Sequence, residues 1–164
     1  MKIRKLTPES YAKASGLLRQ AGSTDEVQLV EKLHENGKTM HEWVCIHVNK
    51  IIAYIAFSNA YNGSNICGLH LAPLAVKPEF QKQEVGAELL RFALRQAVIK
   101  EKTIFVLGHH SFYKKFGFDS CNMPICPFDK KNVKFLSIRN NISSQFTVGY
   151  EPEFNPEWLN RKER

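Results

Sequence analysis

The sequence contains few of the residues that cross-link a protein or anchor it in a membrane. Its four cysteines form no C-x-x-C pair and have no histidine at zinc-ligand spacing. We therefore expect no metal site and no disulfide framework, and reduced thiols fit a cytoplasmic protein. The longest apolar run, residues 51–57, is far shorter than the ~20 residues of a membrane helix. No membrane segment is expected.

Acidic residues are outnumbered, 16 against 23 lysines and arginines, so the formal charge is +7. Such a balance suits a polyanionic partner: a nucleic acid, a membrane surface or a phosphate-bearing cofactor. The basic residues are spread along the chain, with short clusters at Lys114-Lys115, Lys130-Lys131 and residues 161–164. This spread disfavours nucleic acid and favours a small anion. The alternative is a solvated basic surface that keeps the protein in solution.

What is present is an ordinary globular composition, with 43% hydrophobic and 24% charged residues. At this length we expect one domain, residues 1–164, burying roughly 70% of its unfolded surface. The first eight residues include basic ones, but no apolar segment follows them. No secretory signal is therefore expected.

The first 58 residues predict a strand, two helices and a hairpin. Residues 2–6 alternate polar and apolar like a strand, and Thr7-Pro8-Glu9 predicts a helix start that leads to about Gln20. Ser23 and Glu26 form a capping box, and the helix behind them should end at Asn36-Gly37. The β-rich residues 43–48 and 51–58 predict a hairpin joined by Asn49-Lys50.

The remainder predicts an alternation of strands and helices without repeats or linkers. A polar loop over residues 59–65 leads to an extended stretch, 66–76, whose Pro73 belongs at an edge or a bulge. A helix follows with apolar positions from Val85 to Ala97 and Val98. The other expected elements are a strand at 103–107, a short helix at 111–116 ending at Gly117, a loop at 120–131, and strands at 133–138 and 145–150.

The junction between the 66–76 stretch and the next helix is a candidate anion site. A helix that starts directly after a strand presents free amide groups and the positive end of its dipole. The junction has the single glycine Gly86, and neither a G-x-G-x-x-G nor a Walker pattern. A plain strand-to-helix turn is the alternative interpretation.

Residues 71–90, LAPLAVKPEFQKQEVGAELL, resemble the acetyl-CoA-binding motif of the GNAT superfamily of N-acetyltransferases. In that family Q/R-x-x-G-x-G/A begins the cofactor helix, after a strand ending in V-x-P. Residues 105–118, FVLGHHSFYKKFGF, resemble the family's next signature, a tyrosine before an F-G-F turn. The similarity is most specific to a predicted branch carrying L-G-P-L-A-V, and residues 147–154 loosely resemble that branch's ending.

The resemblance implies a mixed α/β fold with a central, mostly antiparallel sheet, helices on both faces, and a splayed strand pair that binds CoA. Backbone groups of the kinked strand would pair with the pantetheine arm, and loop amides would hold the pyrophosphate. The corresponding cofactor-binding residues are Leu74, Ala75 and Val76 on the strand and Gln81, Lys82, Gln83, Glu84, Val85, Gly86 and Ala87 in the loop.

Two side chains are candidates for catalysis. The resemblance implies that Tyr113 protonates the departing CoA thiolate, while a tyrosine buried in the core is the alternative. His70 is our candidate base for the amine, although a strand histidine is more often only hydrogen-bonded. His109 matches the family's H/D position, and His110 replaces its proline. Glu42, Asn59 and Tyr61 could line an acceptor pocket by their placement alone.

Two departures from the family pattern lie in the loop. Glu84 stands where the first glycine of Q-x-x-G-x-G is expected, and Lys82 where a preceding glycine is often found. A Cβ at position 84 narrows the backbone angles, and its carboxylate would repel a pyrophosphate. Lys82 could partly offset that repulsion.

The resemblance thus predicts an N-acetyltransferase, an acyltransferase that moves an acetyl group from acetyl-CoA to a primary amine of a small molecule or protein. The alternative, motivated by Glu84, is a weak or inactive CoA-binding regulatory module on the same fold. A basic nucleic-acid-associated domain is a third interpretation. The acceptor and a homodimer both stay open.

Overall fold

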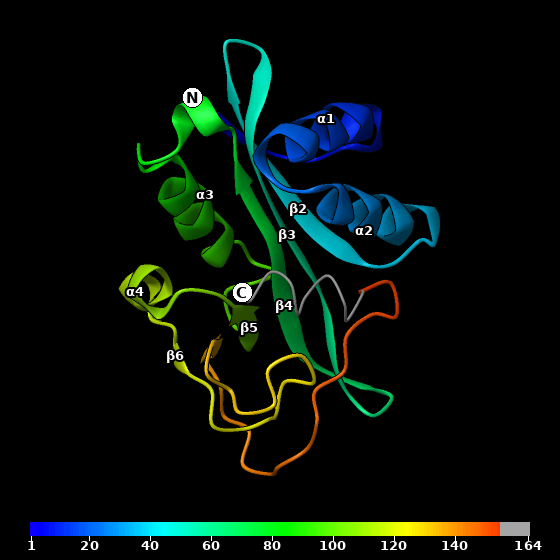
Figure 1. Cartoon of the computed structure of the whole chain (residues 1–164), viewed down its shortest axis with the longest axis vertical. Coiled ribbons are helices and arrows are strands. Elements are labelled where there is room, and N and C mark those ends of the chain that lie inside the picture. The colour runs from blue at the N-terminus through cyan, green and yellow to red at the C-terminus, as the bar shows by residue number, and fades with distance from the viewer. Residues whose placement is uncertain (155–164) are drawn as a thin grey trace. The chain divides into compact units, whose positions relative to one another are not determined.

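The computed structural model describes residues 1–154. It is a mixed α/β fold with a seven-stranded sheet in the order β1-β2-β3-β4-β5-β7-β6 (Figure 1). The pairs β1–β2, β5–β7 and β6–β7 are antiparallel, and β4–β5 is parallel. The expected fold class, a mostly antiparallel sheet with helices, is confirmed. The chain divides into two compact units, and β3 and β4 run through both.

The first unit comprises residues 1–57 and 72–100. Its elements are β1 (Lys2–Lys5), η1 (Pro8–Ser10), α1 (Tyr11–Ala21), α2 (Thr24–Glu35), β2 (Met40–His47), the first part of β3 (Lys50–Asn62), the last part of β4 (Asn65–Val76), η2 (Pro78–Phe80) and α3 (Val85–Leu94).

Local signals start and stop the first two helices. The Ser23 hydroxyl accepts a 3.2 Å hydrogen bond from the Glu26 amide, as the capping box predicts, and Gly37 follows α2 with a positive φ of 65°. Thr7 makes no side-chain cap, and the chain enters α1 through the 3₁₀ turn η1. The predicted helix is therefore present, but its first turn is wound more tightly.

Helices cover both faces of the strands in this unit. Side chains of α1 and α2, among them Leu18 and Val30, share one buried cluster with Val44, Tyr54 and Ala75 of the sheet. Helix α3 contacts β2 and lies on the other side of the strands from α1 and α2 (Figure 1). Burial of these apolar side chains from water is the main stabilising contribution to the unit.

Two predicted boundaries in the first unit were wrong. The β2–β3 turn is Val48-Asn49 rather than Asn49-Lys50, with φ of 49° and 61°, the signs of a type I′ turn. Helix α3 ends at Leu94, so Ala97 and Val98 lie outside it. Beyond it the amides bond three residues back, as Gln96 does to Ala93, and these tighter turns replace the predicted last helical turn.

The second unit comprises residues 58–71 and those from 101 onward. Besides parts of β3 and β4 it contains β5 (Ile104–Leu107), α4 (His110–Tyr113), η3 (Lys114–Phe116), β6 (Asp119–Ser120) and β7 (Phe135–Ile138). The predicted short helix and its end at Gly117 are confirmed, with Gly117 at φ 100°. The two-residue strand β6 carries no pattern long enough to be predicted.

Three further predictions differ from the structure of this unit. The expected loop at 59–65 is strand except for a turn at residues 63 and 64, because β3 and β4 are paired neighbours in the sheet joined by that two-residue turn. The Tyr61 backbone also exchanges two hydrogen bonds with Gly149. The expected strand at 145–150 is instead two isolated bridges, through Thr147 and Gly149. The predicted strand at 133–138 begins only at Phe135.

Within residues 1–154 no helix has the length and apolarity needed to cross a membrane. The assignment of the chain to one domain stays a prediction.

Candidate functional site

The last residues of β4 lie beyond its pairing with β5. The register between these strands contains two pairs, Leu69–Ile104 and His70–Phe105. Pro73, which has no N–H to donate, follows the paired part of β4, in keeping with the predicted irregularity. Ala75 is buried in the core, while Leu74 and Val76 are half-buried. The backbone of residues 74–76 is thus placed past the segment of β4 that pairs with β5.

Two glutamine side chains fasten the loop that follows. The Gln81 amide donates to the Val76 carbonyl at 2.9 Å, and the Gln83 amide donates to the Glu79 carbonyl at 3.0 Å. The loop is therefore tied both to the end of β4 and to the turn η2. This contact gives Gln81, the first residue of the family-like motif, a structural role in the first unit.

The loop then passes twice through the left-handed region. Lys82 has φ 63° and Glu84 has φ 67°. For a residue with a Cβ this conformation costs about 1–2 kcal/mol relative to the right-handed one. The conformation explains why a glycine is expected at position 84 in related motifs, and Glu84 adopts it nonetheless.

The start of α3 has the free donors that an anion site requires. The first helical hydrogen bond runs from the Glu88 amide to the Glu84 carbonyl at 2.9 Å, so the amides of Val85, Gly86 and Ala87 precede it. Glu84, the N-cap residue, makes no side-chain cap. A Cβ on Gly86 would lie 3.2 Å from Val76 Cγ2, so glycine fits the close packing of helix against strand. These residues fit a pyrophosphate, since unpaired amides and the helix dipole both favour negative charge.

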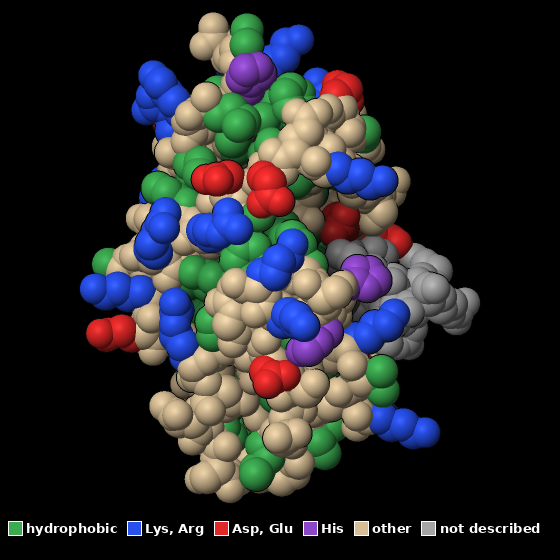
Figure 2. All heavy atoms as spheres, turned by 90° about the vertical axis from the view of Figure 1, so that its left-hand side faces the viewer, with side chains coloured by type: hydrophobic (Ala, Val, Ile, Leu, Met, Phe, Trp, Pro, Cys, Tyr) green, Lys and Arg blue, Asp and Glu red, His purple; other side chains and the backbone are tan. Residues whose placement is uncertain are grey.

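The carboxylate of Glu84 is turned toward its own helix. Its Oε2 lies 3.9 Å from an Arg91 guanidinium nitrogen, and Arg91 also lies 3.7 Å from Glu88. Because these side chains are largely exposed, the pairs contribute little stability. They do place a positive charge beside the carboxylate. On the face of the molecule in Figure 2, basic side chains are spread widely, with a few acidic ones among them.

In the second unit His70 is buried and held by the C-terminal segment. Its Nε2 donates to the Gly149 carbonyl at 3.0 Å, and its ring stacks on Tyr150 with centroids 3.6 Å apart. Burial lowers the pKa of His70 to about 3. The lone pair must therefore be on Nδ1, which has no hydrogen-bond partner in the described structure. The general-base role stays a prediction, and the low pKa weighs against it.

Tyr113 is the last residue of α4, and its ring packs against the backbone of Gly108. A Cβ on Gly108 would lie 2.4 Å from Tyr113 Cε2, so only glycine fits there. Phe118 meets the ring edge-on, with centroids 5.5 Å apart. Burial raises the pKa of Tyr113 well above its usual range, so the phenol stays protonated. Within residues 1–154 its hydroxyl makes no hydrogen bond, and the role of Tyr113 as proton donor stays a prediction.

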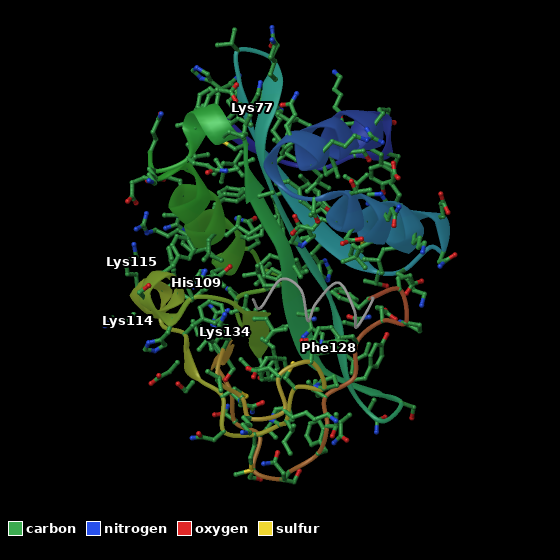
Figure 3. The ribbon with its side chains drawn as sticks, viewed as in Figure 1. Lys77, His109, Lys114, Lys115, Phe128 and Lys134 are labelled. Carbon is green, nitrogen blue, oxygen red and sulfur yellow. The ribbon has the colours of Figure 1, made fainter. Side chains whose placement is uncertain are left out.

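Basic side chains surround α4 in the same unit (Figure 3). Lys114 and Lys115 are exposed, with the Lys115 ammonium 5.3 Å from the Phe112 ring centre. His109, the N-cap residue of α4, makes no side-chain cap, and His110 lies 3.2 Å from the exposed carboxylate of Asp119. The contacts of His109 and His110 do not test whether either histidine takes part in the site.

A buried polar cluster in the first unit was missed at the sequence level. Glu42 accepts hydrogen bonds from the Tyr54 hydroxyl at 2.5 Å and from His34 Nε2 at 2.7 Å, and His34 stacks on Tyr11. Glu42 therefore has internal partners, and its place in an acceptor pocket stays a prediction. In the second unit the Tyr61 hydroxyl donates to Glu151 at 2.9 Å, and Asn59 lies half-buried on β3.

Three features of this α/β protein fit the binding of a phosphorylated ligand. The pairing of β4 with β5 ends early, the loop that follows has left-handed residues, and the helix α3 starts without a side-chain cap. Comparison with known proteins agrees. The model of the acetyltransferase (GNAT) domain matches residues 38–120, just over half of the chain. The chain therefore belongs to the GNAT acetyltransferase family.

Three relatives illustrate the relationship. The uncharacterized N-acetyltransferase YjhQ of Escherichia coli K12 is 33% identical over 109 residues, which cover 63% of this chain. The matched part spans 60% of the length of YjhQ. The E. coli GNAT family N-acetyltransferase YhbS in complex with CoA superposes with a TM-score of 0.82 at 23% identity, covering 93% of this chain and 90% of YhbS. A GNAT family acetyltransferase from Brucella melitensis in complex with acetyl-CoA gives 0.78 and 23%, covering 94% and 97%.

Proposed function

We propose that the chain is an N-acetyltransferase that moves an acetyl group from acetyl-CoA to a primary amine. The observation that carries the proposal is the uncapped start of α3 behind the left-handed loop of residues 81–84. Family membership supports it, because the matched residues include this loop. Two structural relatives were crystallised with CoA or acetyl-CoA, in agreement with this donor.

The first unit would hold the donor. The amides of Val85, Gly86 and Ala87 donate to the pyrophosphate, and Lys82 adds a positive charge at the same loop. Left-handed residues in such loops turn successive N–H groups toward one anion. The backbone of residues 74–76 pairs with the amides of the pantetheine arm as an added strand would.

Tyr113 would act in the chemical step. Acetyl-CoA supplies a thioester carbonyl that a neutral amine can attack. The phenol of Tyr113 is protonated at neutral pH and donates that proton to the leaving thiolate, although burial raises its pKa and makes it a weaker acid than a free phenol. The contacts of His70 favour a positioning role, in which the ring fixes the segment at Gly149 and Tyr150. The acceptor amine, on a small molecule or a protein, is left open, as are cytoplasmic location and a homodimer.

The alternative, a CoA-binding module without turnover, has one observation in its favour, the Cβ and carboxylate of Glu84 at the helix start. Both functions predict CoA binding, and only the transferase releases CoA in the presence of a competent amine. A screen of amines, read by a thiol reagent, therefore separates them.

Replacing Gly86 by valine tests the donor site itself. The new side chain would meet Val76 and crowd the amides at the helix start, so we expect acetyl-CoA affinity to fall at least about tenfold. Gly16→Val is the matched control, since nothing lies within 4 Å of a Cβ at Gly16 in α1. Calorimetry with both variants measures the effect. Unchanged affinity in a folded Gly86→Val protein would remove the site from this loop.

A further inference from the structure

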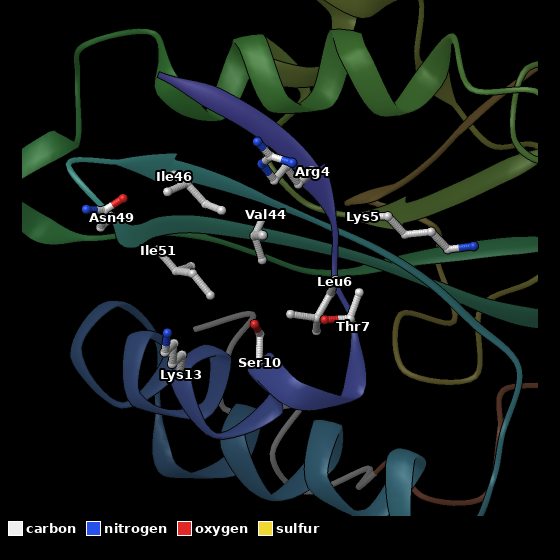
Figure 4. A pocket seen from close by; sticks show the side chains of 10 residues that line it. All are labelled: Arg4, Lys5, Leu6, Thr7, Ser10, Lys13, Val44, Ile46, Asn49 and Ile51. Carbon is white, nitrogen blue, oxygen red and sulfur yellow. The ribbon is translucent and has the colours of Figure 1, made fainter.

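A pocket of about 400 Å³ lies in the first unit, on the α1 side of the strands (Figure 4). Its walls come from β1, the entry to α1, β2 and the start of β3. The volume falls in the range of about 300–1,000 Å³ that is typical of small-molecule sites. None of its lining residues belongs to the loop of residues 81–87 or to α3, so this pocket is separate from the proposed donor site.

The floor of the pocket is aliphatic. Val44 and Leu6 are buried, while Ile46 and Ile51 are half-buried and keep part of their apolar surface open. No aromatic ring within residues 1–154 lines the pocket. A flexible alkyl chain can cover such a floor of branched aliphatic side chains and bury its apolar surface. This burial is favourable and needs no directed contact.

The rim is cationic. Arg4 and Lys13 are exposed, and neither makes an ion pair within residues 1–154. The side chain of Ser10 points from the start of α1 toward the floor (Figure 4), and it makes no capping bond. Glu9, which precedes Ser10 in the chain, has its carboxylate bonded to the Thr7 hydroxyl. Lys5 also lines the pocket, so three basic side chains and a hydroxyl donor are available to an anionic group.

We propose that this pocket binds a small aliphatic monocarboxylate. The carboxylate lies against Arg4 and Lys13, with Ser10 as a further donor, and the alkyl chain covers the aliphatic floor. The guanidinium of Arg4 matches the two oxygens of a carboxylate in a way that a point charge does not. An alkyl phosphate shares the negative charge and the chain, and differs in its headgroup.

The probe is hexanoate, titrated into the whole chain without acetyl-CoA and followed through the backbone amides by NMR. We expect saturable shifts at β1, at residues 7–13 and at the β2–β3 turn, with residues 81–87 unmoved. Acetate, which lacks the chain, and hexylamine, which reverses the charge, should each bind at least about tenfold more weakly. Hexyl phosphate should bind no more tightly than hexanoate.

Substitutions of the two basic side chains test whether they bind the carboxylate. Arg4→Gln and Lys13→Gln should each weaken hexanoate binding about fivefold, the effect of one partly exposed charge pair. Lys100→Gln removes an equal charge from the same unit outside the pocket and should leave the affinity unchanged. Equal binding of hexylamine, tighter binding of hexyl phosphate, or shifts confined to residues 81–87 would each overturn the proposal. So would undiminished affinity in the Arg4→Gln/Lys13→Gln double variant.

Discussion

Replacing Glu84 by glycine and, separately, by glutamine distinguishes the two effects that this side chain has on the donor loop. Glu84 has φ 67°, which costs a residue with a Cβ about 1–2 kcal/mol. Glycine removes that cost, but it lowers the free energy of unfolding by about 0.5–1 kcal/mol because it loses more conformational freedom on folding. Glu84→Gly should therefore raise the free energy of unfolding by up to about 1.5 kcal/mol, whereas Glu84→Gln should leave it nearly unchanged.

Binding should respond to the charge rather than to the backbone. A carboxylate and a phosphate about 4 Å apart repel each other by about 1 kcal/mol in water-like surroundings, and Arg91, 3.9 Å from this carboxylate, partly neutralises it. Both variants should thus tighten CoA binding by up to about fivefold. The gain should shrink as salt rises from about 50 mM to 500 mM, because the side chain of Glu84 is 67% exposed and its field is screened.

Calorimetry with CoA at several salt concentrations, together with urea unfolding, measures both effects. Glu88→Gln is the control, since Glu88 shares the Arg91 partner but lies within the helix. We expect a smaller gain in affinity for it. Weaker CoA binding by both Glu84 variants at every salt concentration would refute this reasoning and show that the carboxylate contacts the ligand favourably.

Three further substitutions test the interior groups. Tyr113→Phe should lower kcat about 10²-fold with a competent amine while CoA affinity stays within a few-fold, and an unchanged kcat with chemistry rate-limiting would exclude this proton donor. The pKa of His70 is about 3 in the folded protein and 6.5 when unfolded, so below pH 6.5 the unfolded state binds a proton that the folded state does not. The free energy of unfolding should therefore decrease as the pH is lowered, by up to about 2 kcal/mol at pH 5. Urea unfolding of His70→Phe should show a shallower fall, and an identical slope would contradict the assignment. Tyr54→Phe removes a donor to buried Glu42 and should destabilise the fold by about 1–3 kcal/mol in the same assay, where no loss would mean that the bond contributes nothing.

Features encoded over a few neighbouring residues could be predicted from the sequence. The Ser23–Glu26 cap, the helix end at Gly37 and the turn at Gly117 depend on local hydrogen bonds and on φ. The strand-to-helix junction of the candidate donor site belongs to this class, because free amides follow from where α3 begins. The left-handed backbone at Glu84 could also be anticipated, since the motif has a glycine at that position.

Features that depend on contacts between residues far apart in the sequence were visible only in the tertiary structure. The sequence predicts a strand from residue 145 to 150, but this segment makes only isolated bridges, through Thr147 to Ile125 and through Gly149 to Tyr61, almost ninety residues away. The low pKa of His70 arises from burial beneath Tyr150, which no spacing near residue 70 reveals. The pocket beside Arg4 likewise exists only once three strands and the start of α1 come together. Local sequence determines where elements begin and end, but burial and pairing depend on contacts that only the folded chain makes.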